Sequence, residues 1–182
     1  LLIESTYGNR VHPRDSENGL REIIKDVAAR QSCLIVPAFA VGRTQEVIYV
    51  IRKMEDAGEI PAIPVHIDSP MAIQATDIYC RHTEEHDFEM AQLSSHEGCP
   101  ISSRHMVIDR TPEQSKAVND VKGPVIIISA SGMATGGRVL HHLKHRLPDP
   151  ETTVLLVGYQ AEGTRGRSLQ DGVRELKMLG EI

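Results

Sequence analysis

The sequence predicts an α/β fold with a mostly parallel sheet and helices on both faces, similar in layout to a Rossmann fold. Short apolar runs alternate along the chain with segments in which apolar residues recur at helical spacing. The apolar runs lack the alternating polar residues of a half-exposed strand, which is expected when both faces of a strand are covered. Strands that alternate with helices form βαβ units, and these units build parallel sheets.

Each expected element follows from the spacing of its apolar residues. Leu20, Ile23 and Val27 recur at helical spacing, whereas Val125–Ile128 is a continuous apolar run. The expected order is a strand over 1–4, a helix over 15–30, a strand over 33–37, a helix over 42–56, a strand over 63–67, a helix over 70–81, a strand near 107, a helix over 112–119, a strand over 125–128, a helix over 138–146 and a strand over 153–157. Residues 82–104 are polar and irregular, so no long element is expected there.

One of these helices has a start signal of its own. Ser69 suits the N-cap position, where its hydroxyl accepts a hydrogen bond from a free backbone N–H, and Pro70 suits the first turn. The same capping account explains Asp68, so the residues alone assign no functional role to Asp68-Ser69-Pro70.

Composition limits the possible classes of protein. With no Trp and only two Phe, the core must be aliphatic, and a net charge of -5 argues against a uniformly basic nucleic-acid-binding surface while allowing a local basic patch. Cys33, Cys80 and Cys99 form no CxxC pattern, which predicts reduced thiols and a cytoplasmic protein. No apolar run approaches the roughly 20 residues of a membrane span, so no membrane partner is expected. The chain opens with Leu inside an apolar segment, and we interpret it as part of a longer protein.

Ligands of parallel sheets bind at the carboxyl ends of the strands, and two such ends carry a single charged candidate. Glu4, at the end of the first expected strand, is a candidate acid, base or partner of a histidine, and the alternative is a solvated loop carboxylate. Arg43 lies near a helix N-terminus, where a bound anion would also meet free N–H groups, and the alternative is an ion pair with Glu46 or Glu59.

The loop after the most apolar strand is the strongest candidate for phosphate binding. It runs from Ser129 to Arg138, precedes a helix and is rich in glycine, although its spacing matches neither a Walker A loop nor GxGxxG. The helix that follows it carries six basic or histidine side chains, and the alternative to a basic binding surface is a solvated helix face. Phosphate or RNA binding is therefore predicted, with these candidate ligands: Ser131, Gly132, Gly136, Gly137, Arg138 and Lys144.

Two histidine pairs, His82/His86 and His141/His145, have the spacing of residues one helical turn apart. Such pairs can bind zinc, but neither has an evident third ligand, and His82 is not followed by the Glu of HExxH. The sequence contains no HxHxDH motif. No metal ligand is therefore assigned within this chain.

Five segments in order resemble the β-CASP domain of metallo-β-lactamase-fold ribonucleases, in particular bacterial and archaeal RNA-processing members related to the cleavage and polyadenylation endonuclease. The segments are Leu2-Ile3-Glu4-Ser5-Thr6-Tyr7-Gly8-Asn9-Arg10, Ile35-Val36-Pro37-Ala38-Phe39-Ala40-Val41-Gly42-Arg43-Thr44-Gln45-Glu46, Asp68-Ser69-Pro70-Met71-Ala72, Ser131-Gly132-Met133-Ala134-Thr135-Gly136-Gly137-Arg138 and Gly158-Tyr159-Gln160-Ala161-Glu162-Gly163-Thr164. The resemblance covers nearly the whole chain and is weakest over about 82–112.

The resemblance implies a hydrolase that cleaves RNA phosphodiester bonds with two zinc ions held by a metallo-β-lactamase domain. Single-stranded RNA would enter the cleft between that domain and the β-CASP domain. Glu4 matches the acidic residue beside the metal site and would be the one catalytic residue here. The zinc ligands are expected outside this chain, so the chain alone is expected to be inactive.

The resemblance also implies a division of the chain into 1–12, leaving the metallo-β-lactamase domain, 13–170, the β-CASP domain, and 171–182, returning to the first domain. The expected partners are single-stranded RNA and the metallo-β-lactamase domain of the same chain, and the sequence leaves the oligomeric state open, with a homodimer as one option. Two alternatives stay open: a non-catalytic module that binds RNA or a nucleotide, and a β-CASP DNA nuclease.

Overall fold

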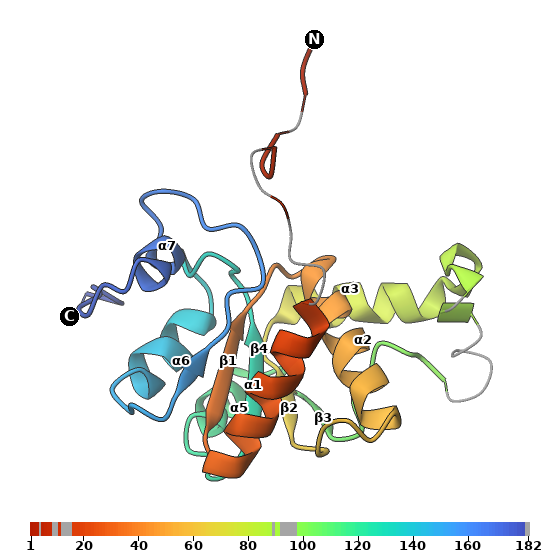
Figure 1. Cartoon of the computed structure of the whole chain (residues 1–182), viewed down its shortest axis with the longest axis horizontal. Coiled ribbons are helices and arrows are strands. Elements are labelled where there is room, and N and C mark those ends of the chain that lie inside the picture. The colour runs from red at the N-terminus through yellow and green to blue at the C-terminus, as the bar shows by residue number, and fades with distance from the viewer. Residues whose placement is uncertain (4, 9–10, 12–15, 89, 92–97, 181–182) are drawn as a thin grey trace.

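The computed structural model describes residues 1–3, 5–8, 11, 16–88, 90–91 and 98–180. The helices from α1 (Ser16–Arg30) onward pack around one sheet, and the N-terminal segment extends away from it (Figure 1). The five strands lie in the order β3-β2-β4-β1-β5, and every neighbouring pair is parallel. The strands are β1 (Cys33–Pro37), β2 (Val65–Ile67), β3 (Met106–Ile108), β4 (Val125–Ser129) and β5 (Thr153–Val154). The prediction of a mostly parallel α/β sheet is confirmed.

Helices cover both faces of this sheet, as the continuous apolar runs predicted. The helical segments are α1 (Ser16–Arg30), α2 (Arg43–Asp56), α3 (Pro70–Arg81), the 3-10 turn η1 (Thr83–Glu85), α5 (Pro112–Val118), α6 (Val139–Arg146) and α7 (Arg165–Gln170). In β1, Leu34 packs into an apolar cluster with α1 and α2, whereas Ile35 packs into a second cluster with α5 and α6. Figure 1 shows α1 crossing the viewer's side of the sheet. Neighbouring residues of β1 therefore pack on opposite faces of the sheet, which explains why its apolar run has no alternating polar residues.

The capping signals at helix starts are confirmed. The hydroxyl of Ser69 accepts a hydrogen bond from the N–H of Ala72 at 3.3 Å, and Pro70 occupies the first turn of α3. The short helix α7 was not predicted. It begins after Thr164, whose hydroxyl accepts from the N–H of Arg167 at 3.2 Å, but six residues are too few to show a helical period.

The first and the last of the strands expected along the sequence differ from the prediction. Residues Leu1, Leu2 and Ile3 are fully or largely exposed and form no strand, because no described residue pairs with them, and an isolated strand leaves its backbone groups unpaired. Glu4, the end of that expected strand, lies outside the described residues. The last strand covers only Thr153–Val154, because β5 is an edge strand with β1 as its single neighbour.

The prediction that the cysteines are reduced is wrong for two of the three. Cys80, in the last turn of α3, forms a disulfide with Cys99, with a Cα–Cα distance of 5.3 Å. Their separation of 19 residues in the sequence gave no sign of this contact. Cys33 is a buried free thiol in β1.

No helix in the described ranges is long and apolar enough to span a bilayer.

Candidate functional site

The loops that leave β1, β2 and β4 are joined at the carboxyl edge of the sheet. The N–H of Ala38, after β1, donates to the carbonyl of Ser129 at 3.0 Å, and the hydroxyl of Ser129 donates to the carbonyl of Asp68 at 2.7 Å. Because these strands are parallel and in register, their ends lie at one edge. Three of the candidate loops therefore share one surface, as expected from the sequence.

The loop between β4 and α6 is closed on itself by Ser131. Its hydroxyl oxygen accepts hydrogen bonds from the N–H groups of Thr135 and Gly136, at 3.0 and 3.3 Å. Gly137 has a φ of 80°, and a Cβ there would lie 2.4 Å from the carbonyl oxygen of Ala130, so only glycine fits. Ser131 and Gly137 thus define the loop, which we call the Ser131 loop (residues 130–138).

The Ser131 loop has two backbone N–H groups, just before the start of α6, that are unpaired within the described residues. No described residue accepts a hydrogen bond from the N–H of Gly137 or of Arg138. These two groups directly precede α6, where the helix dipole places partial positive charge. The arrangement is able to receive an anion such as a phosphate through backbone N–H groups.

Arg138 is turned inward and joins three segments of the chain. One guanidinium nitrogen donates to Asp68 Oδ1 at 2.6 Å and to the carbonyl of Asp109 at 2.9 Å, while the other donates to the carbonyl of Arg110 at 3.0 Å. Its side chain is 21% exposed. The geometry therefore makes Arg138 a support of the loop, with part of its surface left toward solvent.

The centre of this support is Asp68, which the sequence reading treated as part of a helix cap. Its carboxylate is fully buried and also accepts hydrogen bonds from the Ser115 hydroxyl and, at 2.6 Å, from His142 Nε2. Burial alone would raise the pKa of Asp68, but the hydrogen bonds from His142, Ser115 and Arg138 outweigh it and hold that pKa below its usual value. The ionised carboxylate locks the Ser131 loop to the sheet.

The basic surface expected on α6 is smaller than the sequence suggested. His142 is fully buried between Asp68 and Asn119, whose Oδ1 lies 2.7 Å from His142 Nδ1. Arg146 donates to the carbonyls of Val118 and Val121. Lys144, together with His141 and His145, is exposed on the outer side of the helix.

Gln160 is a site residue that sequence reasoning missed. It is 2% exposed, and its side-chain nitrogen donates to the carbonyls of Gly132 at 3.0 Å and Gly158 at 3.1 Å. A Cβ at Gly166 would lie 1.7 Å from Gln160 Oε1, so the packing requires glycine there. Gln160 joins the loop after β5 to the Ser131 loop, and its position within the fifth motif was the only available signal.

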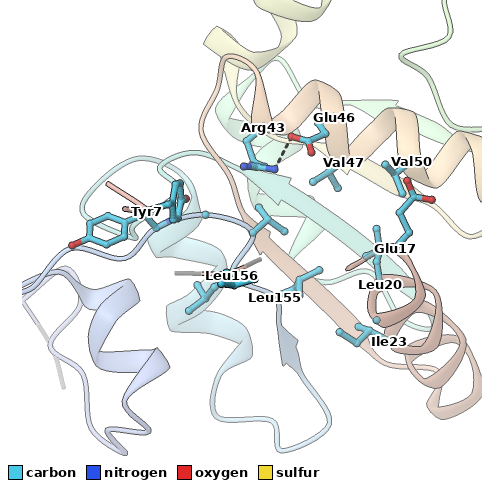
Figure 2. A pocket seen from close by; sticks show the side chains of 15 residues that line it. Tyr7, Glu17, Leu20, Ile23, Arg43, Glu46, Val47, Val50, Leu155 and Leu156 are labelled. Carbon is cyan, nitrogen blue, oxygen red and sulfur yellow. Dashed lines mark hydrogen bonds and ion pairs between the residues drawn. The ribbon is translucent and has the colours of Figure 1, made fainter. Parts of the chain in front are cut away.

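Arg43 has the ion-pair partner that was the alternative to anion binding. It pairs with Glu46 at 2.6 Å, and its side chain is 37% exposed. Both residues line a groove of about 710 Å³. Figure 2 shows the pair next to Val47, with Leu20 across the groove on α1. The structure therefore places Arg43 on a partly apolar groove at the start of α2.

The two histidine pairs do not form a zinc site within the described residues. Within the described ranges, no group of three or more His, Cys, Asp or Glu side chains is close enough to hold a metal ion. His82 contacts Glu84 at 2.8 Å, and His86 contacts the carbonyl of Tyr79 at 2.9 Å. Because protein zinc sites use three or four ligands, no zinc-dependent step is assigned to these residues.

Comparison with known proteins gives a consistent set of relatives. The Beta-Casp domain family matches residues 44–169. Ribonuclease TTHA0252 of Thermus thermophilus is 33% identical over 183 residues, which cover 100% of this chain and 42% of that protein. Transcription termination factor FttA of Pyrococcus abyssi is 36% identical over 100% of this chain and 28% of that protein. An RNase J-like protein of Methanocaldococcus jannaschii is 33% identical over 97% of this chain and 41% of that protein.

The chain spans less than half the length of each of these relatives. The matched residues 44–169 contain the Ser131 loop, Asp68 and Gln160, so the supports described above lie within the family match. That match covers most of the chain. On this basis, the chain belongs to the Beta-Casp domain family.

Proposed function

We propose that this chain is the RNA-binding part of a zinc-dependent ribonuclease that hydrolyses phosphodiester bonds of single-stranded RNA. Two of the relatives described above are named as a ribonuclease and an RNase J-like protein. The proposal places the zinc ligands in a metallo-β-lactamase domain outside these residues, with 1–12 and 171–182 leading to and from it. Glu4 remains the proposed catalytic residue, and a cytoplasmic location remains a prediction.

The Ser131 loop is the single observation that carries this proposal. It is a turn closed by hydrogen bonds at the carboxyl edge of a parallel sheet, and the N–H groups of Gly137 and Arg138 have no partner within the described chain. A phosphate would take these donors, with Ser131, Gly132 and Gly136 forming the wall of the turn. Lys144 would add positive charge that attracts the RNA backbone without reading its sequence, while Arg138 and Arg43, which are paired with Asp68 and Glu46, would contact phosphate only through the part of each guanidinium left exposed.

The experiment uses the full-length protein and compares two serine variants. Ser131→Ala removes the acceptor that closes the loop, whereas Ser102→Ala removes a hydroxyl that donates to the Cys99 carbonyl at 2.9 Å, outside the site. We measure bound zinc, cleavage of single-stranded RNA, and RNA affinity at two salt concentrations. Ser131→Ala should weaken binding about 5- to 10-fold, corresponding to one or two hydrogen bonds. Ser102→Ala should bind like the unaltered protein.

Each alternative has its own outcome in the same experiment. If the protein binds RNA but neither holds zinc nor cleaves the RNA, it is a non-catalytic RNA-binding module and the ribonuclease proposal is wrong. Preferential cleavage of single-stranded DNA in competition with RNA would indicate a DNA nuclease. RNA affinity that does not change with salt would remove the phosphate contacts from the proposal.

A further inference from the structure

We propose that the ring of Phe39 is a stacking surface for one nucleobase of the RNA bound at the Ser131 loop. This inference rests on the proposed function and adds a base contact to the phosphate contacts. Phe39 follows β1 and was not a candidate in the sequence reading. Phe39 is 43% exposed and lies at the edge of the sheet where the candidate loops meet.

The ring lies directly against two glycines of the neighbouring loops. A Cβ on Gly132 would lie 3.0 Å from Cδ2 of Phe39, and a Cβ on Gly158 would lie 3.6 Å from its Cε2. Gly132 belongs to the Ser131 loop, and Gly158 belongs to the loop held by Gln160. Because both residues lack a side chain, one face of the ring can lie against their backbone. The Ser131 loop therefore supports that face of the ring.

The backbone of Phe39 is also fixed. Its carbonyl accepts hydrogen bonds from the N–H and the hydroxyl of Thr44, at 3.2 and 2.7 Å, in the first turn of α2. Ala38 on one side is fully buried, and Ala40 on the other packs against the core. The backbone that carries the ring is therefore already in place before RNA binds, and such pre-organisation favours affinity.

Core packing does not account for the exposed ring. Phe39 is absent from both apolar clusters, although its neighbour Ala38 belongs to one of them. Aromatic residues are scarce in this chain, which has two Phe, four Tyr and no Trp. Tyr7 and Tyr159 meet edge to face at 6.1 Å, and Tyr159 directly follows the glycine against which Phe39 lies. Half of the aromatic side chains of the chain thus belong to this edge.

Stacking suits a site that binds RNA without reading its sequence. Every base has a π face, and base–aromatic stacking tolerates any base. The ring and the phosphate-binding N–H groups are connected through one loop, because Gly132 of the Ser131 loop lies against the ring. The site would then prefer unpaired nucleotides, because a base in a duplex is already stacked on both faces.

The test compares Phe39→Ala, Phe39→Leu, Phe39→Tyr and Phe88→Ala in the full-length protein. Phe88 is the other phenylalanine of the chain and is 79% exposed outside the site, so its variant is the matched control. The probes are a single-stranded RNA oligonucleotide and a chain of the same length whose nucleotides lack bases. Thermal unfolding checks that each variant is folded, and Phe39→Leu keeps the apolar bulk if Phe39→Ala does not fold.

Phe39→Ala and Phe39→Leu should bind the RNA about 5- to 100-fold more weakly, the range for loss of one stacked base. Both should bind the base-free chain within about 2-fold of the unaltered protein, with the same salt dependence, because no phosphate contact is removed. Phe39→Tyr should retain binding, and Phe88→Ala should be unchanged.

Two results would overturn the stacking assignment. An equal loss on both probes would give Phe39 a purely structural role, and no loss on either would remove it from the site. In both cases RNA binding by the unaltered protein and its sensitivity to Ser131→Ala would leave the proposed function standing. Failure of the unaltered protein to bind RNA would remove the proposed function and the stacking inference together.

Discussion

Asp68 joins three segments of the chain through one buried carboxylate. Its oxygens accept hydrogen bonds from α5 through Ser115 and from the start and middle of α6 through Arg138 and His142. Removing one member of a buried, hydrogen-bonded ion pair is strongly destabilising, because the remaining charge stays buried without its partner. Asp68 is thus the residue on which the shape of the Ser131 loop most depends.

Asp68→Asn should lower the free energy of unfolding by about 3 to 5 kcal/mol at pH 7. The pKa of Asp68 is below its usual value when folded, so its ionised form stabilises the fold fully above about pH 4. This stabilisation is lost as the pH falls through the lowered pKa, so the difference between variant and unaltered protein should narrow at acidic pH. Urea unfolding of both proteins across a pH series measures it.

Asp77→Asn is the matched control for this prediction. Asp77 pairs with Arg81 one turn along α3, and both side chains are exposed. Exposed ion pairs contribute less than about 1 kcal/mol, so this variant should unfold close to the unaltered protein. A difference for Asp68→Asn that stays constant from pH 7 to pH 3 would contradict the assigned role of the charge.

Two adjacent glycines of the Ser131 loop should respond differently to alanine. Gly137→Ala forces a side chain into a left-handed conformation and against the Ala130 carbonyl, at a cost of at least about 1 to 2 kcal/mol. A Cβ at Gly136 would meet nothing within 4 Å, so Gly136→Ala should be tolerated. Denaturant unfolding and RNA affinity of the two variants measure the difference, and equal effects would show that the turn is not closed as described.

At the scale of an element, the disulfide Cys80–Cys99 attaches the end of α3 to the segment that leads into β3. A disulfide closing a loop of this size restricts the unfolded chain and typically contributes about 3 kcal/mol. Cys80→Ser or Cys99→Ser should therefore lower the unfolding temperature by the same amount as reduction of the unaltered protein. A reducing agent should have no further effect on either variant, and if it does, the pairing is wrong.

Cys33 should behave differently from the other two cysteines after reduction. It is 3% exposed in β1, and burial raises the pKa of its thiol to about 11, so little thiolate is present at neutral pH. Alkylation of the reduced, folded protein, followed by mass spectrometry, should modify Cys80 and Cys99 well before Cys33. Equal labelling of all three would contradict the burial of β1.

At the scale of the whole molecule, the order of the strands predicts where the backbone opens last. β1 and β4 are central and entirely buried, whereas β3 and β5 are edge strands whose residues are exposed or half-buried. Amide hydrogen exchange should therefore be slowest in β1 and β4 and fastest among the strands in β3 and β5. Uniform protection across the sheet, or slow exchange at its edges, would contradict the strand order.

The elements that were predicted well are those that carry their own signal in the chain. Ser69 and Pro70 predicted the start of α3, and the apolar run ending at Ile128 predicted β4. Both signals come from a few adjacent residues, because a helix cap and a strand buried on both faces are local patterns. The same argument predicted a strand over Leu1–Ile3, and that prediction was wrong. An apolar run becomes a strand only when another strand lies beside it.

The candidate loops were predicted better than the roles of their side chains. That the ends of β1, β2 and β4 meet follows from parallel topology, which the alternation of elements already indicated. That Arg138 turns inward to Asp68 and that His142 is buried depends on how α6 rotates against the sheet. Residues 138 and 142 read as surface charge in the sequence, and only their distant partners show otherwise.

The amino-acid sequence alone was enough to predict the α/β class, the order of most elements, the position of the Ser131 loop and the resemblance to the β-CASP family. These follow from local periods, caps and glycine positions, which act between residues close in the chain. The tertiary structure decided the Cys80–Cys99 disulfide, the buried Asp68 network, the contact of Gln160 with the Ser131 loop and the exposed ring of Phe39. These features depend on contacts between residues far apart in the sequence, for example 19 positions for the disulfide and 74 for His142 and Asp68. Such contacts form only when the chain has folded.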